Sequence, residues 1–392
     1  MPEAAIFCTE LAILTLKITW DTYPLPTASP APYNDVASWG IVPAWGYAIV
    51  IESTTSIPEG TVLWGFWPTS TVPTDLQLKA TEPKGHWIEI AETRQKLMNT
   101  YNRYIEVPRS PDSLSSPNFG EDELEHMAWN ALFRGVWEGA YLISQYVFSP
   151  NSQTQTPIHP LGMVMSWTAR DADLASAVIV SLSASSKTAR SFAYHLSQRP
   201  AAGRPLGLVQ VTSLPSPISK AAESLRSSFP MKTVAYNDVH ESLDWMAGLK
   251  ASKIVIADFG ARANSFGQLL ELIKNHAALR SPKVVIIQVG SQQKVYTDEE
   301  QLAAKEAMSK LGKVQYNTSG VQDAVMQANG AEAYFDKLAH VWNEWYRTRH
   351  ASIPDMRIVW GEGISGASGI EGGWGKLCKG QVGGSEGLVY RL

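Results

Sequence analysis

The chain has 392 residues, of which 44% are hydrophobic and 18% are charged, and its net charge is −4. This composition indicates a globular protein long enough for two domains. The acidic balance excludes the basic face that a nucleic-acid partner requires, and no apolar run reaches the roughly 18 residues of a membrane span.

The cysteine content points to the same class of protein. Cys8 and Cys378 are the only cysteines, which excludes a four-thiolate zinc site and a disulfide framework. An intracellular, reducing location such as the cytoplasm is expected. The first twenty residues carry Glu3 and Glu10 and have no basic start or cleavage site, so they are not predicted to be a signal peptide.

Residues 1–108 are predicted to form β structure, because short apolar runs alternate with Pro and Gly. The expected strands are Ile13–Trp20, Trp45–Glu52, Val62–Phe66 and His86–Ile90, and Tyr101-Asn-Arg-Tyr closes the region. Four prolines make Pro24–Trp39 a loop. The Ser- and Pro-rich residues 109–121 are expected to be a linker or surface loop.

From residue 121 onwards the pattern changes to helix and then to alternating strand and helix. Glu121–Phe148 and Ala331–His350 are predicted to be long helices. The predicted strands are Ala177–Leu182, Leu206–Val211, Thr233–Ala235, Lys253–Ala257 and Lys283–Gln288. The predicted helices among them are Thr188–Gln198, Ile218–Phe229, Ser242–Leu249, Ser265–His276 and Glu299–Lys310. This alternation predicts a parallel sheet covered on both faces, that is, a doubly wound α/β domain of the Rossmann type.

The tail, Ile358–Leu392, contains eleven glycines and one strand-like run, Gly387-Leu-Val-Tyr. The predicted domains are therefore a β-rich domain over residues 1–150, a Rossmann domain over residues 151–345, and a segment over residues 346–392 that returns to the first domain.

The stretch Val178–Leu196 has the form of a nucleotide-phosphate site. A buried strand is followed by small polar residues and then by a helix with one apolar face. The first N–H groups of such a helix are unpaired and attract anions. The dinucleotide fingerprint G-x-G-x-x-G is replaced here by Ser183-Ala-Ser-Ser-Lys-Thr. Candidate phosphate-binding residues are Ser185, Ser186, Lys187 and Thr188, and a plain structural turn is the alternative.

The ends of the other strands carry further candidates. Thr212 and Ser213 follow the second strand, where an acidic residue would bind the ribose of NAD. A hydroxyl at Ser213 and a cation at Lys220 suit a 2′-phosphate instead, and hence NADPH. Tyr236, Asp258 and Gly290 stand after the third, fourth and fifth strands, and we predict that they also contact the cofactor.

The order and spacing of these residues resemble the zinc-free quinone oxidoreductase and enoyl reductase branch of the medium-chain dehydrogenase/reductase superfamily. More closely, the chain resembles an uncharacterised family of that branch, a domain of unknown function found in fungi and bacteria. The stretches that carry this resemblance include Trp39-Gly-Ile-Val-Pro-Ala-Trp-Gly-Tyr, Trp64-Gly-Phe-Trp-Pro-Thr-Ser, Leu182-Ser-Ala-Ser-Ser-Lys-Thr-Ala and Ala257-Asp-Phe-Gly.

The resemblance implies a GroES-like β-barrel domain with a shortened N-terminus, a Rossmann domain and a cleft between them. It implies that Ser213, Lys220 and Tyr236 hold the 2′-phosphate of NADPH, that no metal is used, and that two copies can pair through the edge of the Rossmann sheet as a homodimer. The chain departs from the family's pattern at Leu16 and Lys17 and at Gly290-Ser-Gln-Gln.

The expected function is NADPH-dependent reduction of an apolar conjugated carbonyl compound, such as an enone, a quinone or a polyketide-like chain, in specialised metabolism. The cofactor supplies the hydride, so the protein needs only a proton donor, and the candidate catalytic residues are Tyr23 and Asp21. The candidate residues of the substrate cleft are its aromatic side chains: Trp20, Trp39, Trp45, Trp67, Tyr104, Trp137 and Tyr141.

Two other functions remain open at this point. A redox-neutral cyclase or dehydratase on the same scaffold would use Asp21, Tyr23, His86 or Glu138 as acid or base. A pseudoenzyme without a cofactor is the other alternative: the missing glycines favour it, and the set of Ser213, Lys220 and Tyr236 opposes it.

Overall fold

The computed structural model describes residues 6–8, 22–26, 28–108, 119–151, 155–262, 264–291 and 310–392, and also residues 299, 302 and 306. The chain forms two compact units: unit 1 consists of residues 1–134 and 357–392, and unit 2 consists of residues 135–356. These limits differ from the positions 150 and 345 expected from the sequence. The first one falls inside helix α3 (Glu121–Leu142), which crosses it without a break.

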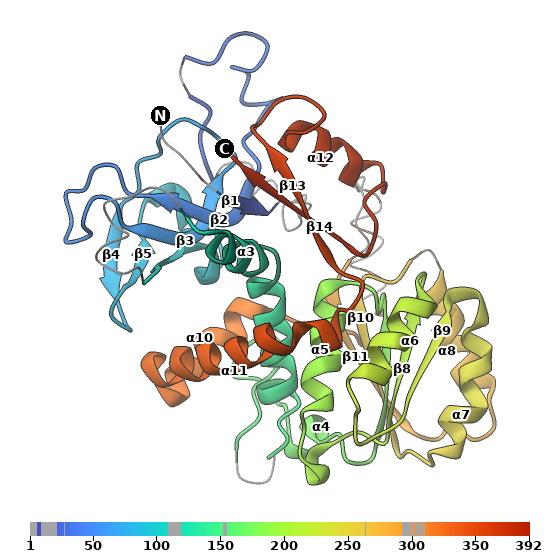
Figure 1. Cartoon of the computed structure of the whole chain (residues 1–392). Helices are drawn as coiled ribbons and strands as arrows, with labels where there is room; N and C mark the ends of the chain where they lie inside the picture. Colours follow the sequence, from blue (N-terminus) through green and yellow to red (C-terminus); the bar gives the residue numbers. More distant parts are fainter. Residues whose placement is uncertain are drawn as a thin grey trace. The chain divides into compact units, whose positions relative to one another are not determined.

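Unit 1 is built on a mainly antiparallel sheet (Figure 1). In the described part of the chain its eight strands follow the order β13-β14-β1-β2-β3-β6-β5-β4. Their bounds are β1 (Ile6–Cys8), β2 (Pro43–Ile49), β3 (Val62–Pro68), β4 (Leu78–Thr81), β5 (His86–Glu89), β6 (Arg103–Glu106), β13 (Arg357–Glu362) and β14 (Glu386–Arg391). Only β13 and β14 pair in parallel, so the C-terminal tail completes the N-terminal sheet.

The tail contains more structure than its sequence suggests. Besides the expected strand β14 it forms β13 and a helix, α12 (Ile370–Cys378). The glycines of the tail made β13 and α12 hard to predict, but they are needed for packing. A Cβ at Gly361 or Gly373 would overlap the ring or hydroxyl of Tyr390 on β14. The prediction of a single strand in the tail was therefore wrong, since its glycines serve close approach rather than loop structure.

Unit 2 is built on a six-stranded parallel sheet in the order β12-β11-β10-β7-β8-β9 (Figure 1). The strands are β7 (Ala177–Leu182), β8 (Gly207–Thr212), β9 (Met231–Ala235), β10 (Lys253–Phe259), β11 (Lys283–Gly290) and β12 (Val314–Gln315). Renumbered from β7 as the first strand, this is the order 3-2-1-4-5-6 of the dinucleotide-binding fold. The predicted fold class, an N-terminal β domain and a Rossmann-type parallel sheet, is confirmed.

Helices cover both faces of this sheet. Those of unit 2 after the shared helix α3 are η3 (Ile143–Val147, a π-helical turn), α4 (Ala169–Ala172), α5 (Lys187–Ser197), η4 (Ala201–Gly203), α6 (Pro215–Ser224), η5 (Tyr236–Ser242), α7 (Leu243–Gly248), α8 (Ser265–Asn275), α10 (Thr318–Asn329) and α11 (Ala331–Ser352). Unit 1 has two short 3-10 helices, η1 (Glu92–Arg94) and η2 (Asn99–Asn102).

Alternating side chains divide the core of unit 2 into two faces. Val178 and Val180 of β7 pack with Ile254 and Ile256 of β10 against helices α7 and α8, which contribute Met246, Phe266, Leu269 and Ile273. Helices α5 and α6 both contact α11, which places these three helices together. The strands are buried on both faces, which explains their nearly continuous Val and Ile runs.

Several expected elements differ from the structure. Strands β4 and β12 and helix α10 were not predicted, because β4 has four residues, β12 has two, and α10 is polar along much of its length. Helix α6 begins three residues early at Pro215, which suits the first helical turn. The predicted strand Ile13–Trp20, most of the linker 109–121 and most of the helix Glu299–Lys310 lie outside the described residues.

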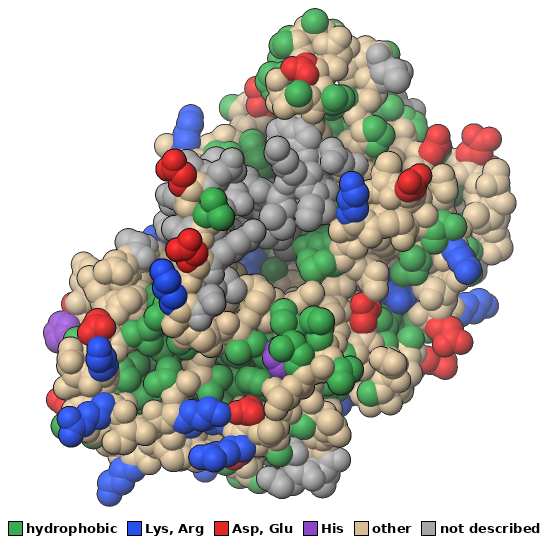
Figure 2. Space-filling model, turned by 180° about the vertical axis from the view of Figure 1, so that it is seen from behind, with side chains coloured by type: hydrophobic (Ala, Val, Ile, Leu, Met, Phe, Trp, Pro, Cys, Tyr) green, Lys and Arg blue, Asp and Glu red, His purple; other side chains and the backbone are tan. Residues whose placement is uncertain are grey.

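On the face drawn in Figure 2, acidic and basic side chains are both present, with basic ones gathered toward the lower left, and hydrophobic side chains are exposed between them. Among the described residues, no helix is both long and apolar enough to cross a membrane.

A buried cation fixes the start of strand β10. Lys253 is only 5% exposed, and its Nζ donates hydrogen bonds to the carbonyl oxygens of Arg170 (3.0 Å), Asp171 (3.2 Å) and Asp173. Burial lowers the pKa of this ammonium group. Backbone carbonyls are thus the principal compensation for the buried charge, and they join the segment before β7 to the central strand β10.

We expect Lys253→Met to lower the free energy of unfolding by about 2–3 kcal/mol, because buried carbonyls lose their donor. Urea unfolding followed by circular dichroism measures the change. Lys283→Met is the matched control: Lys283 pairs with Lys253 in register and bonds Asp171 at 2.6 Å, but its side chain is 50% exposed. Its loss should stay below about 1 kcal/mol. Equal losses would contradict the assigned role of Lys253.

Candidate functional site

The candidate site lies where the strand order of unit 2 reverses. Strands β7 and β10 are neighbours in the sheet, but β7 leads into α5, which contacts α11, whereas β10 leads into α8 on the other face. In open parallel sheets, ligands bind in the crevice outside the carboxyl ends of the strands at such a point. The residues after β7, β8, β9 and β10 therefore define the site.

The turn after β7 has the backbone of a phosphate-binding loop without its glycines. Ser183 has φ of +57°, a left-handed conformation that normally requires glycine. The N–H of Ala184 donates to Val211 O at 2.9 Å, which ties the turn to β8. The Ser186 hydroxyl accepts from the N–H of Ala189 at 3.3 Å and caps α5.

Hydroxyl side chains occupy all three glycine positions of the fingerprint, since Ser183, Ser185 and Thr188 stand at its first, third and sixth residues. Ser185, Ser186, Lys187 and Thr188 are all half-buried at the start of α5. Lys187 adds a positive charge to this helix N-terminus, which also attracts anions. The residues present therefore fit a phosphate group, with hydroxyl donors added to the usual backbone N–H groups.

A hydrogen-bonded chain joins the ends of three strands. The Ser183 hydroxyl donates to Gly260 O at 2.5 Å, and it also lies 2.8 Å from the Tyr236 hydroxyl. Gly260 has φ of +117°, which a side chain would oppose. The chain crosses the crevice between β7 and β10 and brings Tyr236, from the end of β9, to the same point.

Arg190, in the second turn of α5, stabilises the turn after β7 that resembles a phosphate-binding loop. The arginine is 3% exposed, its Nε donates to Ser185 O at 3.0 Å, and its two NH groups bind the carboxylate of Asp355 at 2.5 and 2.8 Å. Burial of Asp355 raises the pKa of its carboxyl, but the hydrogen bonds and charge of Arg190 outweigh burial and leave the pKa below its usual value.

The end of β8 carries hydroxyls, and no carboxylate follows it in the sequence before Glu223. Thr212 is fully buried, and its Oγ1 accepts from the N–H of Leu214 at 3.0 Å, so this residue shapes the turn. Thr212 pairs with Ala235 of β9, which places the next residues, Ser213 and Tyr236, at adjacent strand ends. Ser213 is exposed, as is Lys220 on the following helix α6.

The carboxylate of Asp258, at the end of β10, makes its contacts within the protein. It is 3% exposed, and its Oδ1 accepts from the N–H groups of Gly260 (3.0 Å) and Ala261 (2.8 Å). Its Oδ2 lies 3.2 Å from the Nζ of Lys313. The carboxylate thus shapes the turn that carries Gly260. At Gly290, at the end of β11, an added Cβ would lie 3.0 Å from Phe259 O, so a larger residue would need the backbone there to shift by a few tenths of an ångström.

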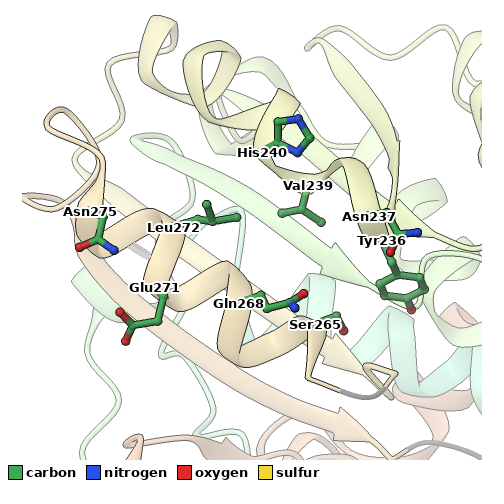
Figure 3. A pocket seen from close by; sticks show the side chains of 9 residues that line it. All are labelled: Tyr236, Asn237, Val239, His240, Ser265, Gln268, Glu271, Leu272 and Asn275. Carbon is green, nitrogen blue, oxygen red and sulfur yellow. The ribbon is translucent and has the colours of Figure 1, made fainter.

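A pocket of about 430 Å³ extends from Tyr236 between η5 and α8. Its lining residues are Tyr236, Asn237, Val239, His240, Ser265, Gln268, Glu271, Leu272 and Asn275. Figure 3 shows Tyr236 and Ser265 toward one end, Gln268 in the middle, and Glu271 and Asn275 toward the other. Amide and hydroxyl groups over an apolar floor can receive the base and ribose of a nucleotide whose phosphates lie at α5.

Tyr23, a predicted catalytic residue, lies in the core of unit 1. It is 5% exposed, its hydroxyl donates to Phe66 O, and it is 3.0 Å from the hydroxyl of Tyr104. Tyr104 also donates to Phe66 O, at 2.7 Å, and accepts from Arg94 NH2 at 3.1 Å. Burial raises the pKa of both phenols. Proton donation by Tyr23 would require its hydroxyl to leave Phe66 O.

The aromatic residues predicted for a substrate cleft occupy different places. Trp67 and Tyr104 meet edge to face, with centroids 4.9 Å apart, in one core cluster of unit 1, while Trp45 stacks on Trp64. Trp137 and Tyr141 are buried in unit 2 around His195. Of the described members of the set only Trp39 is exposed, at 41%. Trp20 and the second catalytic candidate, Asp21, lie outside the described residues.

The acid–base candidates of the redox-neutral alternative are buried in separate cores. His86 in unit 1 lies 3.1 Å from Arg103 NH1. Burial, together with nearby arginines, lowers its pKa to about 3, so it is neutral at pH 7. Glu138 in unit 2 accepts hydrogen bonds from Gln322 and, at 2.6 Å, from the Tyr334 hydroxyl. Within the described part of the chain, no group of three His, Cys, Asp or Glu side chains is placed to share a metal ion.

Sequence reasoning missed Ser183, Arg190 and Lys313 as contributors to the site. Ser183 had a usable signal, because it stands at the first glycine position of the fingerprint, where a left-handed backbone is expected. Arg190 had none, since its partner Asp355 is 165 residues away in the chain. Lys313 precedes a strand of two residues and could not be assigned to the sheet.

The profile of a family described as "Protein of unknown function (DUF2855)" matches residues 17–383. No curated protein matches the chain.

Solved structures resemble the chain at low sequence identity. A mutant form of enoyl thioester reductase from Candida tropicalis is 10% identical, with 100% of this chain and 91% of that one covered and a TM-score of 0.44. The yhdH oxidoreductase from Salmonella enterica in complex with NADP is 8% identical over 100% and 91% of the chains, with a TM-score of 0.41. CurF ER cyclopropanase from the curacin A biosynthetic pathway is 10% identical over 99% and 90%, with a TM-score of 0.43. At these values the similarity says nothing about the activity of this chain.

We expect Asp355→Asn to lower the free energy of unfolding at pH 7 by about 2–3 kcal/mol, because Arg190 remains buried without its carboxylate. The carboxyl pKa is lowered in the folded state, so its stabilisation is complete above the unfolded pKa of about 3.9 and is lost as the pH falls below that value. Urea unfolding at a series of pH values should show the difference from wild type shrinking in acid. Glu344→Gln, an exposed residue on α11, should change little at any pH. A difference for Asp355→Asn that does not depend on pH would contradict the assigned pair.

Removing the two phenol hydroxyls of unit 1 should have unequal effects. Tyr23→Phe should lower the free energy of unfolding by about 1 kcal/mol, because Phe66 O keeps Tyr104 as a donor. Tyr104→Phe should cost about 2–3 kcal/mol, because the buried Arg94 also loses an acceptor. Thermal and urea unfolding measure both changes. A larger loss for Tyr23→Phe than for Tyr104→Phe would show that this network has been misassigned.

Proposed function

This chain belongs to the family described as protein of unknown function (DUF2855), and we propose that it binds NADPH at the carboxyl ends of strands β7, β8 and β9 and acts as a zinc-free reductase. The observation that carries this proposal is the turn after β7. A left-handed residue there precedes a serine-capped helix at the point where the order of a 3-2-1-4-5-6 sheet reverses. A dinucleotide is the ligand that this topology suits.

The preference for NADPH over NADH rests on the end of β8. NAD-specific sites place a carboxylate there to bind the ribose 2′-hydroxyl, whereas this chain has Ser213, with the exposed Lys220 on the next helix. Glu223 is the first carboxylate after β8, and it stands near the far end of α6. We assign Ser213 and Lys220 to the 2′-phosphate, with Tyr236 beside the ribose.

The other groups of the site would position the ligand. Backbone N–H groups and hydroxyls of residues 185–188 would bind the pyrophosphate, and Arg190 would keep that turn in place through Ser185 O. The pocket between η5 and α8 would hold the adenine. When bound, the nicotinamide supplies the hydride. The substrate class, an apolar conjugated carbonyl compound, rests on the family resemblance alone.

Fluorescence titration with NADPH and NADH tests the proposal. We expect saturable binding of NADPH, and Lys220→Ala should weaken it by about 10- to 100-fold, because a charge-assisted contact to phosphate is lost. NADH binding should change little in that variant. Lys337→Ala, which removes the same charge from the exposed face of α11, is the matched control. If neither dinucleotide binds at millimolar concentration, the proposal fails.

A further inference from the structure

The direction of the hydrogen bonds in the chain Tyr236–Ser183–Gly260 follows from their chemistry. A hydroxyl has one proton to donate, and a carbonyl oxygen can only accept. The Ser183 hydroxyl donates to Gly260 O at 2.5 Å, so its contact of 2.8 Å with Tyr236 must be one in which Tyr236 donates. The single proton of the Tyr236 hydroxyl is therefore already used, and this oxygen can offer a ligand only its acceptor lone pairs.

This direction decides which ribose substituent Tyr236 can bind. A phosphate ester at neutral pH is an acceptor and needs a donor, whereas a ribose hydroxyl can donate to a waiting acceptor. Held by Ser183, the Tyr236 hydroxyl suits an unmodified ribose. Released from Ser183, the same hydroxyl could turn its proton toward a phosphate.

We propose that Ser183 is a specificity-determining residue that acts through Tyr236: by orienting the Tyr236 hydroxyl as an acceptor, it weakens the discrimination between NADPH and NADH. This inference rests on the proposed function, and it extends it, because Lys220 and Ser213 then bind the 2′-phosphate without help from Tyr236. The chain then still prefers NADPH, through Lys220 and Ser213, but less strongly than if Tyr236 also donated to the 2′-phosphate.

The backbone at this position supports a dedicated role for the hydroxyl. With φ of +57°, residue 183 is in a conformation that glycine adopts at no steric cost. A serine in this conformation is strained, and the hydrogen bonds of its hydroxyl to Tyr236 and Gly260 compensate for that strain. Ser183→Gly therefore removes the hydroxyl while keeping the backbone conformation accessible, and the relief of backbone strain offsets part of the cost of the lost hydrogen bonds.

The test is a double-mutant cycle measured by dinucleotide binding. Affinities for NADPH and NADH are determined by fluorescence titration for the wild type, Ser183→Gly, Tyr236→Phe and the double variant. We expect the ratio of NADPH to NADH affinity to rise about tenfold in Ser183→Gly, because the released phenol can donate to the 2′-phosphate. The rise should vanish in the double variant, which has no phenol hydroxyl. Ser252→Gly, an exposed serine just before β10 at the opposite end of the sheet, is the matched control and should leave both affinities unchanged.

The possible results are distinguishable. A ratio that is unchanged or lower in Ser183→Gly overturns the inference while leaving NADPH binding intact, and so does a rise that persists in the double variant. A merely structural role of Ser183 would change both affinities by the same factor and leave the ratio constant, which also overturns it. If the wild type binds neither dinucleotide, the proposed function fails and the inference fails with it.

Discussion

Strands β7 and β10 are hydrogen-bonded neighbours, yet the chain leaves them toward helices on opposite faces of the sheet, so no crossover covers the gap between their carboxyl ends. That constraint locates the site before any side chain is considered. It brings Ser183 to Gly260, and the pairing of β8 with β9 brings Ser213 beside Tyr236. Loops at such a point need to be short and polar, and these are.

Much of the fold of unit 2 could be predicted because its strands are buried on both faces. Runs such as Ala177–Leu182 have few polar residues, and the structure reproduces that strand residue for residue. Elements whose stability comes from neighbours rather than from their own pattern could not be predicted. Strand β12 has two residues, and α12 contains three glycines that no helix propensity would favour.

The position of the site at the strand ends could be predicted from the sequence, but the hydrogen bonds and ion pairs within it could not. The residue types at Ser213 and Lys220 favour a phosphate, whereas the left-handed backbone of Ser183 and the ion pair of Arg190 with Asp355 depend on tertiary contacts between distant residues. The assignment of Trp137 to a substrate cleft stays a prediction, because a buried tryptophan can pack a core as well as line a pocket.

The position of β14 between β13 and β1 has a consequence for the synthesis of the protein. Unit 2 is one continuous segment, so all of its residues are synthesised and leave the ribosome ahead of the tail. Unit 1 is interrupted, and its sheet cannot close until the last strand, which ends at Arg391, has emerged. Domains generally fold from the N-terminus onwards during translation. In this chain the order is reversed, because unit 2 can fold first. The edge of β1 in unit 1 stays unpaired until β14 has been synthesised.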